Sequence, residues 1–162
     1  MANRKKISFD IIVYESLEEL QERDRNLLKK SIEARANAYA PYSNFQVGAA
    51  LKLENGEIVM GSNQENASYP SGLCAERVAV FYAGAKFPDV PMNTLAISVY
   101  SSNYEVLEPA APCGNCRQAI FEYEYKQKSP IRILMMGASG KIIECSSLAD
   151  ILPLGFNNSY LK

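Results

Sequence analysis

The sequence predicts one layered α/β domain in which at least some neighbouring strands run parallel. Two observations lead to this prediction. Helical and strand-like segments alternate along the second half of the 162-residue chain, and an amphipathic helix followed by a hairpin precedes them. No linker, internal repeat or low-complexity tract separates these segments. A chain of this length with 48% hydrophobic residues can bury a core without disulfides or metal.

Two segments near the N-terminus differ in their hydrophobic period. Apolar residues recur at every second position over 7–13, which predicts an extended segment. Ser16 and Glu19 have the spacing of a capping box at the start of a helical turn. Over Glu22–Tyr39 apolar residues recur at three- and four-residue spacing between charged residues, which predicts an amphipathic helix ended by Pro41.

The rest of the chain supplies a hairpin and then alternating helices and strands. Asn55-Gly56 separates the first two strand-like runs and is a strong hairpin signal. The predicted strands are 46–53, 57–62, 94–101, 131–136 and 141–145, with 94–101 as a central strand. The predicted helices are 74–85, 113–126 and a last helical turn at 147–152 before Pro153.

The composition excludes several kinds of chemistry. The chain has no histidine, which rules out Ser-His and Cys-His dyads and histidine-ligated catalytic metals. Its 17 basic and 18 acidic side chains leave a net charge of −1, which argues against nucleic-acid and membrane-surface binding. No membrane-spanning run and no signal peptide are recognised. We therefore expect a cytoplasmic protein whose four cysteines are reduced, metal-bound or catalytic.

Three of the four cysteines stand at the starts of two predicted helices. Cys74-Ala75-Glu76 opens one helix, and Pro112-Cys113-Gly114-Asn115-Cys116 opens the other. A catalytic zinc has three protein ligands and leaves its fourth position for water, and a helix N-terminus favours the thiolate form of cysteine. The two motifs therefore predict one Zn²⁺ per chain, held by Cys74, Cys113 and Cys116. Cys145 is expected to be a buried apolar thiol.

Charged neighbours of these cysteines are predicted to support the chemistry. Glu76 is too close to Cys74 to bind the same metal easily, so we expect it to move the proton of a metal-activated water; the alternative is a glutamate that only complements the helix dipole. Three thiolates around Zn²⁺ leave a net charge of −1. Arg77 and Arg117 are expected to hydrogen-bond the sulfurs and offset that charge, and the alternative for each is a surface ion pair.

The two cysteine motifs resemble the signature of zinc-dependent nucleoside and nucleobase deaminases. More closely, the chain resembles the small homotetrameric cytidine deaminases that use three cysteines. The resemblance runs from about Glu22 to Phe156. It is carried, in the correct order, by Ala40–Ala50, Asn63–Tyr69, Cys74–Glu76, Pro112–Gln118 and Leu152–Phe156.

The resemblance implies a fold and a domain division. The fold would be a three-layer α/β/α arrangement with a mixed five-stranded sheet. Residues 22–162 would form the catalytic domain behind an N-terminal extension, residues 1–21, with an edge strand and a helical turn. The extension lies outside the resemblance, and we expect it to be an extra edge strand or a subunit contact.

The resemblance also implies roles for individual residues in binding the nucleoside. Phe45 would stack on the pyrimidine, Asn63 and Glu65 would hydrogen-bond the ribose hydroxyls, and Ala75 would contact the base through its backbone. A neighbouring subunit of a homotetramer would complete the pocket through three further residues. These are Ala67, Tyr69 and Phe156.

The reaction implied is hydrolysis of cytidine or deoxycytidine to the uridine product and ammonia, as in pyrimidine salvage. Three alternatives remain. The substrate could be another aminopyrimidine nucleoside such as a nucleoside antibiotic, which the ribose-binding pattern of Asn63–Asn66 disfavours. Cys145 could be a fourth ligand that makes the zinc structural. Cys113 and Cys116 could form a redox pair, which leaves Cys74 and Glu76 unexplained.

Overall fold

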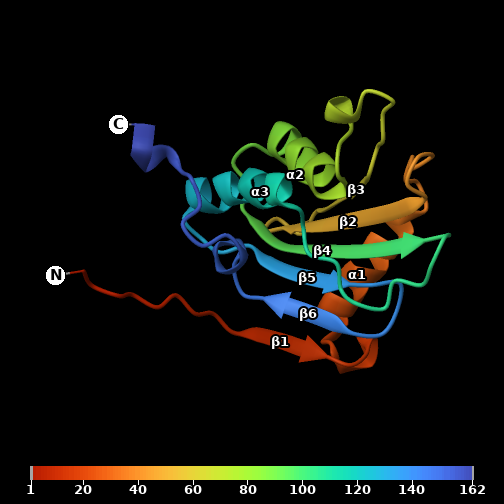
Figure 1. The fold of residues 1–162 in the computed structure, drawn as a ribbon, viewed down its shortest axis with the longest axis horizontal. Coiled ribbons are helices and arrows are strands. Elements are labelled where there is room, and N and C mark those ends of the chain that lie inside the picture. Colours follow the sequence, from red (N-terminus) through yellow and green to blue (C-terminus); the bar gives the residue numbers. More distant parts are fainter. Residues whose placement is uncertain (1, 162) are drawn as a thin grey trace.

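The computed structural model describes residues 2–161, which form one mixed sheet with helices on both faces (Figure 1). Within these residues the strand order is β1-β6-β5-β4-β2-β3. The strands are β1 (Ile11–Tyr14), β2 (Phe45–Leu53), β3 (Ile58–Ser62), β4 (Met92–Ser101), β5 (Arg132–Met136) and β6 (Ile142–Cys145). The α-helices are α1 (Glu22–Arg35), α2 (Ala75–Lys86) and α3 (Gly114–Gln127). No helix in this part of the chain is long and apolar enough to cross a membrane.

The sheet is mixed because β4 and β5 run parallel while every other neighbouring pair is antiparallel. A parallel pair needs a crossover, and α3 provides it between β4 and β5. The prediction of a mixed α/β fold is confirmed. The sheet has six strands in the described chain instead of five, because β1 adds to β6 with Ile11 opposite Cys145 and Tyr14 opposite Ile142.

Two apolar clusters separate the layers. Successive residues of a strand point to opposite faces, so Leu95 and Ile97 of β4 belong to one cluster and Ala96 to the other. The first cluster includes Val80 of α2, and the second includes Leu28 of α1. The helices α2 and α3 therefore cover one face and α1 the other, as Figure 1 shows, which is the three-layer arrangement expected.

The helix α1 ends at Arg35, four residues before the predicted end at Tyr39. Tyr39 instead pairs through its backbone: its N–H donates to the carbonyl of Asn63 at 2.9 Å, and its carbonyl accepts from the N–H of Glu65 at 2.8 Å. This pairing overrides the helical periodicity of the segment. It also fixes the chain over 63–65 beside the sheet.

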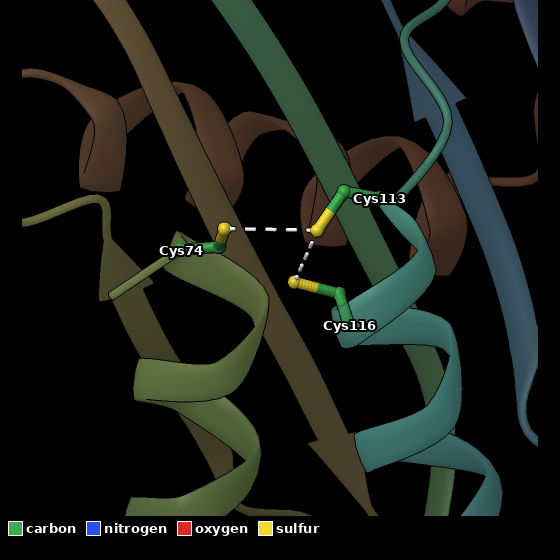
Figure 2. Close-up of side chains that lie close together, drawn as sticks. All are labelled: Cys74, Cys113 and Cys116. Atoms are coloured by element: carbon green, nitrogen blue, oxygen red, sulfur yellow. Dashed lines mark hydrogen bonds between the residues drawn. The ribbon is translucent and has the colours of Figure 1, made fainter. Parts of the chain in front are cut away.

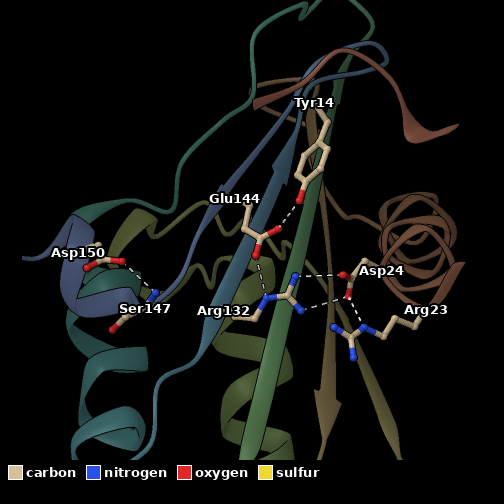
Figure 3. Close-up of polar contacts among 7 residues, drawn as sticks. All are labelled: Tyr14, Arg23, Asp24, Arg132, Glu144, Ser147 and Asp150. Atoms are coloured by element: carbon tan, nitrogen blue, oxygen red, sulfur yellow. Dashed lines mark hydrogen bonds and ion pairs between the residues drawn. The ribbon is translucent and has the colours of Figure 1, made fainter. Parts of the chain in front are cut away.

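The capping box expected at Ser16 is absent, although a 3-10 turn does form over Leu17–Glu19. Ser16 makes no capping bond through its side chain, and the Glu19 carboxylate accepts from the N–H of Glu15 at 3.0 Å. A capping box occurs instead at the 3-10 helix that follows β6: the Asp150 carboxylate accepts from the N–H of Ser147 at 3.0 Å (Figure 3), and the Ser147 hydroxyl accepts from the N–H of Ala149 at 3.1 Å. The last helical turn predicted there is thus a 3-10 helix, Leu148–Ile151.

Arg132 of β5 joins three elements through two ion pairs (Figure 3). Its guanidinium contacts Asp24 of α1 at 3.0 Å and Glu144 of β6 at 2.9 Å. The hydroxyl of Tyr14 donates to the same Glu144 carboxylate at 2.9 Å. Because the two carboxylates are nearly buried, their pairing with Arg132 offsets the cost of removing charge from water. The network joins α1 to the sheet and links β1 with β6 and β5 inside it.

Glu124 of α3 is a buried carboxylate that organises the chain after α3. It accepts from the N–H of Ile131 at 2.7 Å, from the N–H of Leu148 at 2.9 Å and from the hydroxyl of Ser147 at 2.7 Å. These bonds satisfy donors at the start of the 3-10 helix Leu148–Ile151. They tie α3 to both the entry of β5 and the segment after β6.

We expect Glu124→Gln to lower the free energy of unfolding by about 1–3 kcal/mol, because the amide nitrogen cannot accept and leaves buried donors unpaired. Urea unfolding at one fixed concentration of zinc-loaded protein measures the change. Glu122→Gln on the same helix is the control, since Glu122 is exposed. Equal losses for the two variants would contradict the role given to Glu124.

Candidate metal centre

Three cysteine side chains converge where α2 and α3 begin (Figure 2). Cys74 immediately precedes α2, Cys113 immediately precedes α3, and Cys116 lies in the first turn of α3. The sulfur of Cys113 is 3.9 Å from that of Cys74 and 3.5 Å from that of Cys116. All three sulfurs lie within 4.8 Å of one another.

The three sulfurs fit a single zinc ion. Tetrahedral zinc with Zn–S distances of about 2.3 Å sets neighbouring sulfurs about 3.8 Å apart, close to the spacing observed. Among the described residues, the metal-binding group at this place contains these three cysteines and no fourth ligand. Such a set leaves one coordination position for water or substrate, as in catalytic zinc sites.

Cys145 is not part of this group. It is 1% exposed at the end of β6 and belongs to the apolar cluster under α2 and α3. Burial raises the pKa of its thiol. The geometry therefore matches the buried apolar thiol expected and disfavours a closed four-thiolate site.

The surroundings of the sulfurs stabilise negative charge unequally. The pKa of Cys74 is lowered to about 5, first by a hydrogen bond from the Cys116 thiol and further by the Arg77 guanidinium, whose nitrogen is 3.8 Å from the Cys74 sulfur. The pKa of Cys116 is raised because it is the donor to Cys74 and is buried. The N-termini of α2 and α3 also favour thiolate, because the positive end of each helix dipole lies at the cysteines that begin the helix.

Glu76 lies in the first turn of α2, directly behind the cluster, and is 5% exposed. Burial raises the pKa of its carboxyl, and the negative charge of the Cys74 thiolate raises it further. A carboxyl whose pKa is raised holds a proton more readily than an ordinary carboxylate does. Its position is consistent with the predicted proton transfer.

The two arginines differ in what they contact. A guanidinium nitrogen of Arg77 lies 3.8 Å from the Cys74 sulfur. Arg117 was expected at the sulfurs too, but its guanidinium donates to the carbonyl oxygens of Pro112 at 2.8 Å and Ile151 at 2.9 Å. These two carbonyls lie in the turn before α3 and at the end of the 3-10 helix Leu148–Ile151. They bind the Arg117 guanidinium in place of the sulfurs. Arg117 thus holds the segment before Cys113 in place.

A cleft of about 510 Å³ opens beside Cys74 and Arg77. Of the residues predicted to bind the nucleoside or a neighbouring subunit, Asn63, Glu65 and Tyr69 line it. Phe45 is half-buried at the start of β2 and Ala75 is fully buried at the start of α2, so neither lines the cleft. Ala67 and Phe156 are exposed outside it.

Asn63 and Glu65 already bind the backbone that precedes and begins β2. The Asn63 amide accepts from the N–H of Val47 at 2.8 Å and donates to the carbonyl of Phe45 at 2.9 Å. The Glu65 carboxylate accepts from the N–H of Tyr42 at 2.8 Å and from the hydroxyl of Ser43. These bonds give the cleft one rigid wall.

Tyr42 and Ser43 line the cleft although sequence reasoning gave them no role. The Ser43 hydroxyl also accepts from the N–H of Phe45 at 3.0 Å, so it links Phe45 to Glu65. The available signal was a small hydroxyl residue in a short polar loop after Pro41, a position typical of local side-chain bonds to the backbone.

Comparison with known proteins identifies a matching family over most of the chain. Residues 21–129 match the family described as the cytidine and deoxycytidylate deaminase zinc-binding region. A cytidine deaminase from Halalkalibacterium halodurans is 45% identical over 130 residues, 80% of this chain and 91% of the relative. A cytidine deaminase from Sporosarcina psychrophila is 37% identical over 136 residues, 84% of this chain and 93% of the relative.

Solved structures give the same result for the fold. The crystal structure of cytidine deaminase from Burkholderia pseudomallei has a TM-score of 0.71 and 36% identity, covering 85% of this chain and all of that one. The structure of cytidine deaminase from Mycobacterium tuberculosis has a TM-score of 0.64 and 29% identity, covering 84% of this chain and 98% of that one.

We expect Cys145→Ser to retain one zinc per chain and Cys113→Ser to lose it, because only Cys113 belongs to the three-sulfur group. Metal content after dialysis against a weak chelator measures both. The buried hydroxyl of Cys145→Ser should cost about 1–3 kcal/mol of stability, so unfolding is followed in parallel. Loss of zinc from folded Cys145→Ser would show that the site has four protein ligands.

Proposed function

The chain belongs to the family of cytidine and deoxycytidylate deaminases, and we propose on this basis that it hydrolyses cytidine or deoxycytidine to the uridine product and ammonia. The observation that carries the proposal is the open three-cysteine cluster with buried Glu76 behind it and a cleft beside it. A thiol redox pair would explain Cys113 and Cys116 alone. The relatives compared here are cytidine deaminases, so a nucleoside antibiotic as substrate is not favoured.

Zinc bound to Cys74, Cys113 and Cys116 would supply a Lewis acid that lowers the pKa of a water molecule. Glu76 takes a proton from the attacking water and gives it to ring N3, which makes C4 electrophilic. The oxygen of that water forms a bond to C4, and Glu76 then moves the remaining proton of this oxygen to the exocyclic amine as the C4–N bond breaks. One water is consumed, and ammonia leaves. Arg77 offsets the charge of the three thiolates through its contact with Cys74.

The nucleoside is proposed to occupy the cleft beside Cys74. Asn63 and Glu65 would face the ribose hydroxyls with the lone pairs and donors that their bonds to the chain over 42–47 leave free. The family resemblance would also place Phe45 on the pyrimidine and the backbone of Ala75 against the base, next to the cleft but not among the residues that line it. Support comes from Asn63 and Glu65 lining the cleft and from their bonds to Phe45 and to the loop before it. Residues 22–162 would form the catalytic domain.

A homotetramer is part of this proposal. Tyr69 is 75% exposed at the cleft and Phe156 is 55% exposed near the C-terminus, so both present apolar surface that a neighbouring subunit could cover. Ala67 is exposed two residues from Tyr69. We further place the protein in the cytoplasm, where thiols remain reduced and free to bind zinc, and assign it to pyrimidine salvage.

Glu76→Gln is expected to keep one zinc per chain and to lower kcat for cytidine by about 10²–10⁴-fold, since the amide cannot carry a proton. The measurement is the ultraviolet assay for loss of cytidine, with and without a chelator, beside metal analysis. Exposed Glu122→Gln is the control. Normal turnover by zinc-loaded Glu76→Gln would refute the mechanism.

Tyr69→Ala and Phe156→Ala are expected to raise KM for cytidine and to shift the protein from four chains toward fewer, because each removes a proposed contact between subunits. Light scattering after size exclusion measures the assembly, and the cytidine assay measures KM. Tyr104→Ala removes an equally exposed aromatic ring elsewhere and should change neither. A single-chain species with normal KM would rule out shared sites.

A further inference from the structure

The N-terminal extension contains an edge strand with exposed apolar side chains. β1 pairs with β6 on one side, and it is the outermost strand of the sheet in the described chain. Four apolar residues at alternate positions are each 45–60% exposed. They are Ile7, Phe9, Ile11 and Val13. An exposed strand edge with apolar residues is a template for pairing with another strand.

These four side chains form one stripe. Ile11 and Val13 stand opposite Cys145 and Ile143 in register, and both of those residues pack in or against the cluster under α2 and α3. Ile7 and Phe9 share the same alternation, and Figure 1 shows residues 2–10 continuing the line of β1 away from the domain. If β1 were extended toward the N-terminus, Ile7 and Phe9 would therefore lie on the same face of the sheet as Ile11 and Val13.

The charges on either side of the stripe are opposite in sign. Arg4, Lys5 and Lys6 precede it, and Glu15, Glu18 and Glu19 follow it. Within residues 2–161, none of the three basic side chains forms an ion pair. In an antiparallel pair of two such strands, the basic end of one lies beside the acidic end of the other. The segment is thus complementary to a second copy of itself.

We propose that the β1 edges of two copies pair antiparallel, with residues 5–10 becoming strand, so that two sheets join into one. A two-fold axis perpendicular to the sheet keeps the same face on the same side, so the two apolar stripes pack against each other. With Phe9 opposite Ile11 of the partner copy, Lys5 stands opposite Glu15. The same register places Asp10 opposite its own copy on the other face, where two like charges weaken the pair.

This interface uses residues distinct from those proposed to complete the cleft, so it does not depend on the homotetramer or on the deaminase reaction. In Figure 1 the strand β1 lies at the sheet edge opposite to β3, with the metal-binding ends of α2 and α3 on a covering layer. Changes in the stripe are therefore expected to alter assembly and leave the zinc site unchanged.

Sedimentation of the full-length zinc-loaded protein at low salt tests the pairing. Phe9→Lys with Ile11→Lys should lower the molar mass of the largest species, because one of two proposed interfaces is lost, while zinc content and cytidine turnover stay at the wild-type level. Ile58→Lys on β3, the opposite edge strand, is the control and should leave the mass unchanged. An unchanged mass of the double variant overturns the proposal.

Charge exchange and cross-linking test the register. Lys5→Glu should weaken the pair at least tenfold, Lys5→Glu with Glu15→Lys should restore it, and Asp10→Asn should strengthen it. Asp10→Cys should form a disulfide-linked dimer on mild oxidation, whereas Met60→Cys on β3 should not. Failure of Asp10→Cys to cross-link, or failure of the charge exchange to restore the pair, overturns the proposal.

Discussion

The metal centre of this protein depends on a fold that brings three sulfur atoms from the starts of two different helices to within 4.8 Å of one another. Cys74 and Cys113 stand at helix starts 39 positions apart, so the two helices must begin side by side on the same face of the sheet. The strand β4 lies between them in the chain, and α3 crosses back to β5 beside it. Gly61 lets α2 approach β3 closely, since a Cβ there would lie 2.5 Å from the carbonyl of Ala75.

The absence of histidine gives this metal centre its particular electrostatics. Three thiolates carry more negative charge than neutral imidazoles would, and the protein answers with two helix N-termini and one arginine at the Cys74 sulfur. Arg117 takes part indirectly, by fixing the backbone around Pro112. The charge of the site is therefore offset by a side chain at one sulfur, Arg77 at Cys74, together with the dipoles of the two helices that begin there.

Much of this arrangement could be predicted from the sequence, for reasons that differ between elements. Cys74, Glu76, Cys113 and Cys116 lie in short motifs at the starts of two helices that the local sequence pattern predicts, so their places in the fold could be predicted without tertiary information. The end of α1 could not be predicted, because Tyr39 is held by backbone bonds to a segment more than twenty residues away. The contacts of Arg117 likewise could not be predicted, because one of its acceptors is the carbonyl of Ile151, which only the tertiary fold brings near. The edge strand in residues 1–21 was expected from the alternation over 7–13, but its pairing with β6 depends on the tertiary fold.

Because Asn63 lines the cleft and also bonds the start of β2, ligand binding in the cleft is thermodynamically linked to the order of the chain at the start of β2. Its amide bonds both Phe45 and Val47, so any ligand that orients this amide also stabilises the first residues of β2. Conversely, a substitution at Asn63 changes two things: the fraction of molecules in which the cleft is ordered, and the contacts available to a ligand. The affinity measured for such a variant therefore combines two quantities: the equilibrium between ordered and disordered cleft, and the intrinsic binding constant of the ordered form. They are separated by measuring local hydrogen exchange over 45–47 beside the affinity.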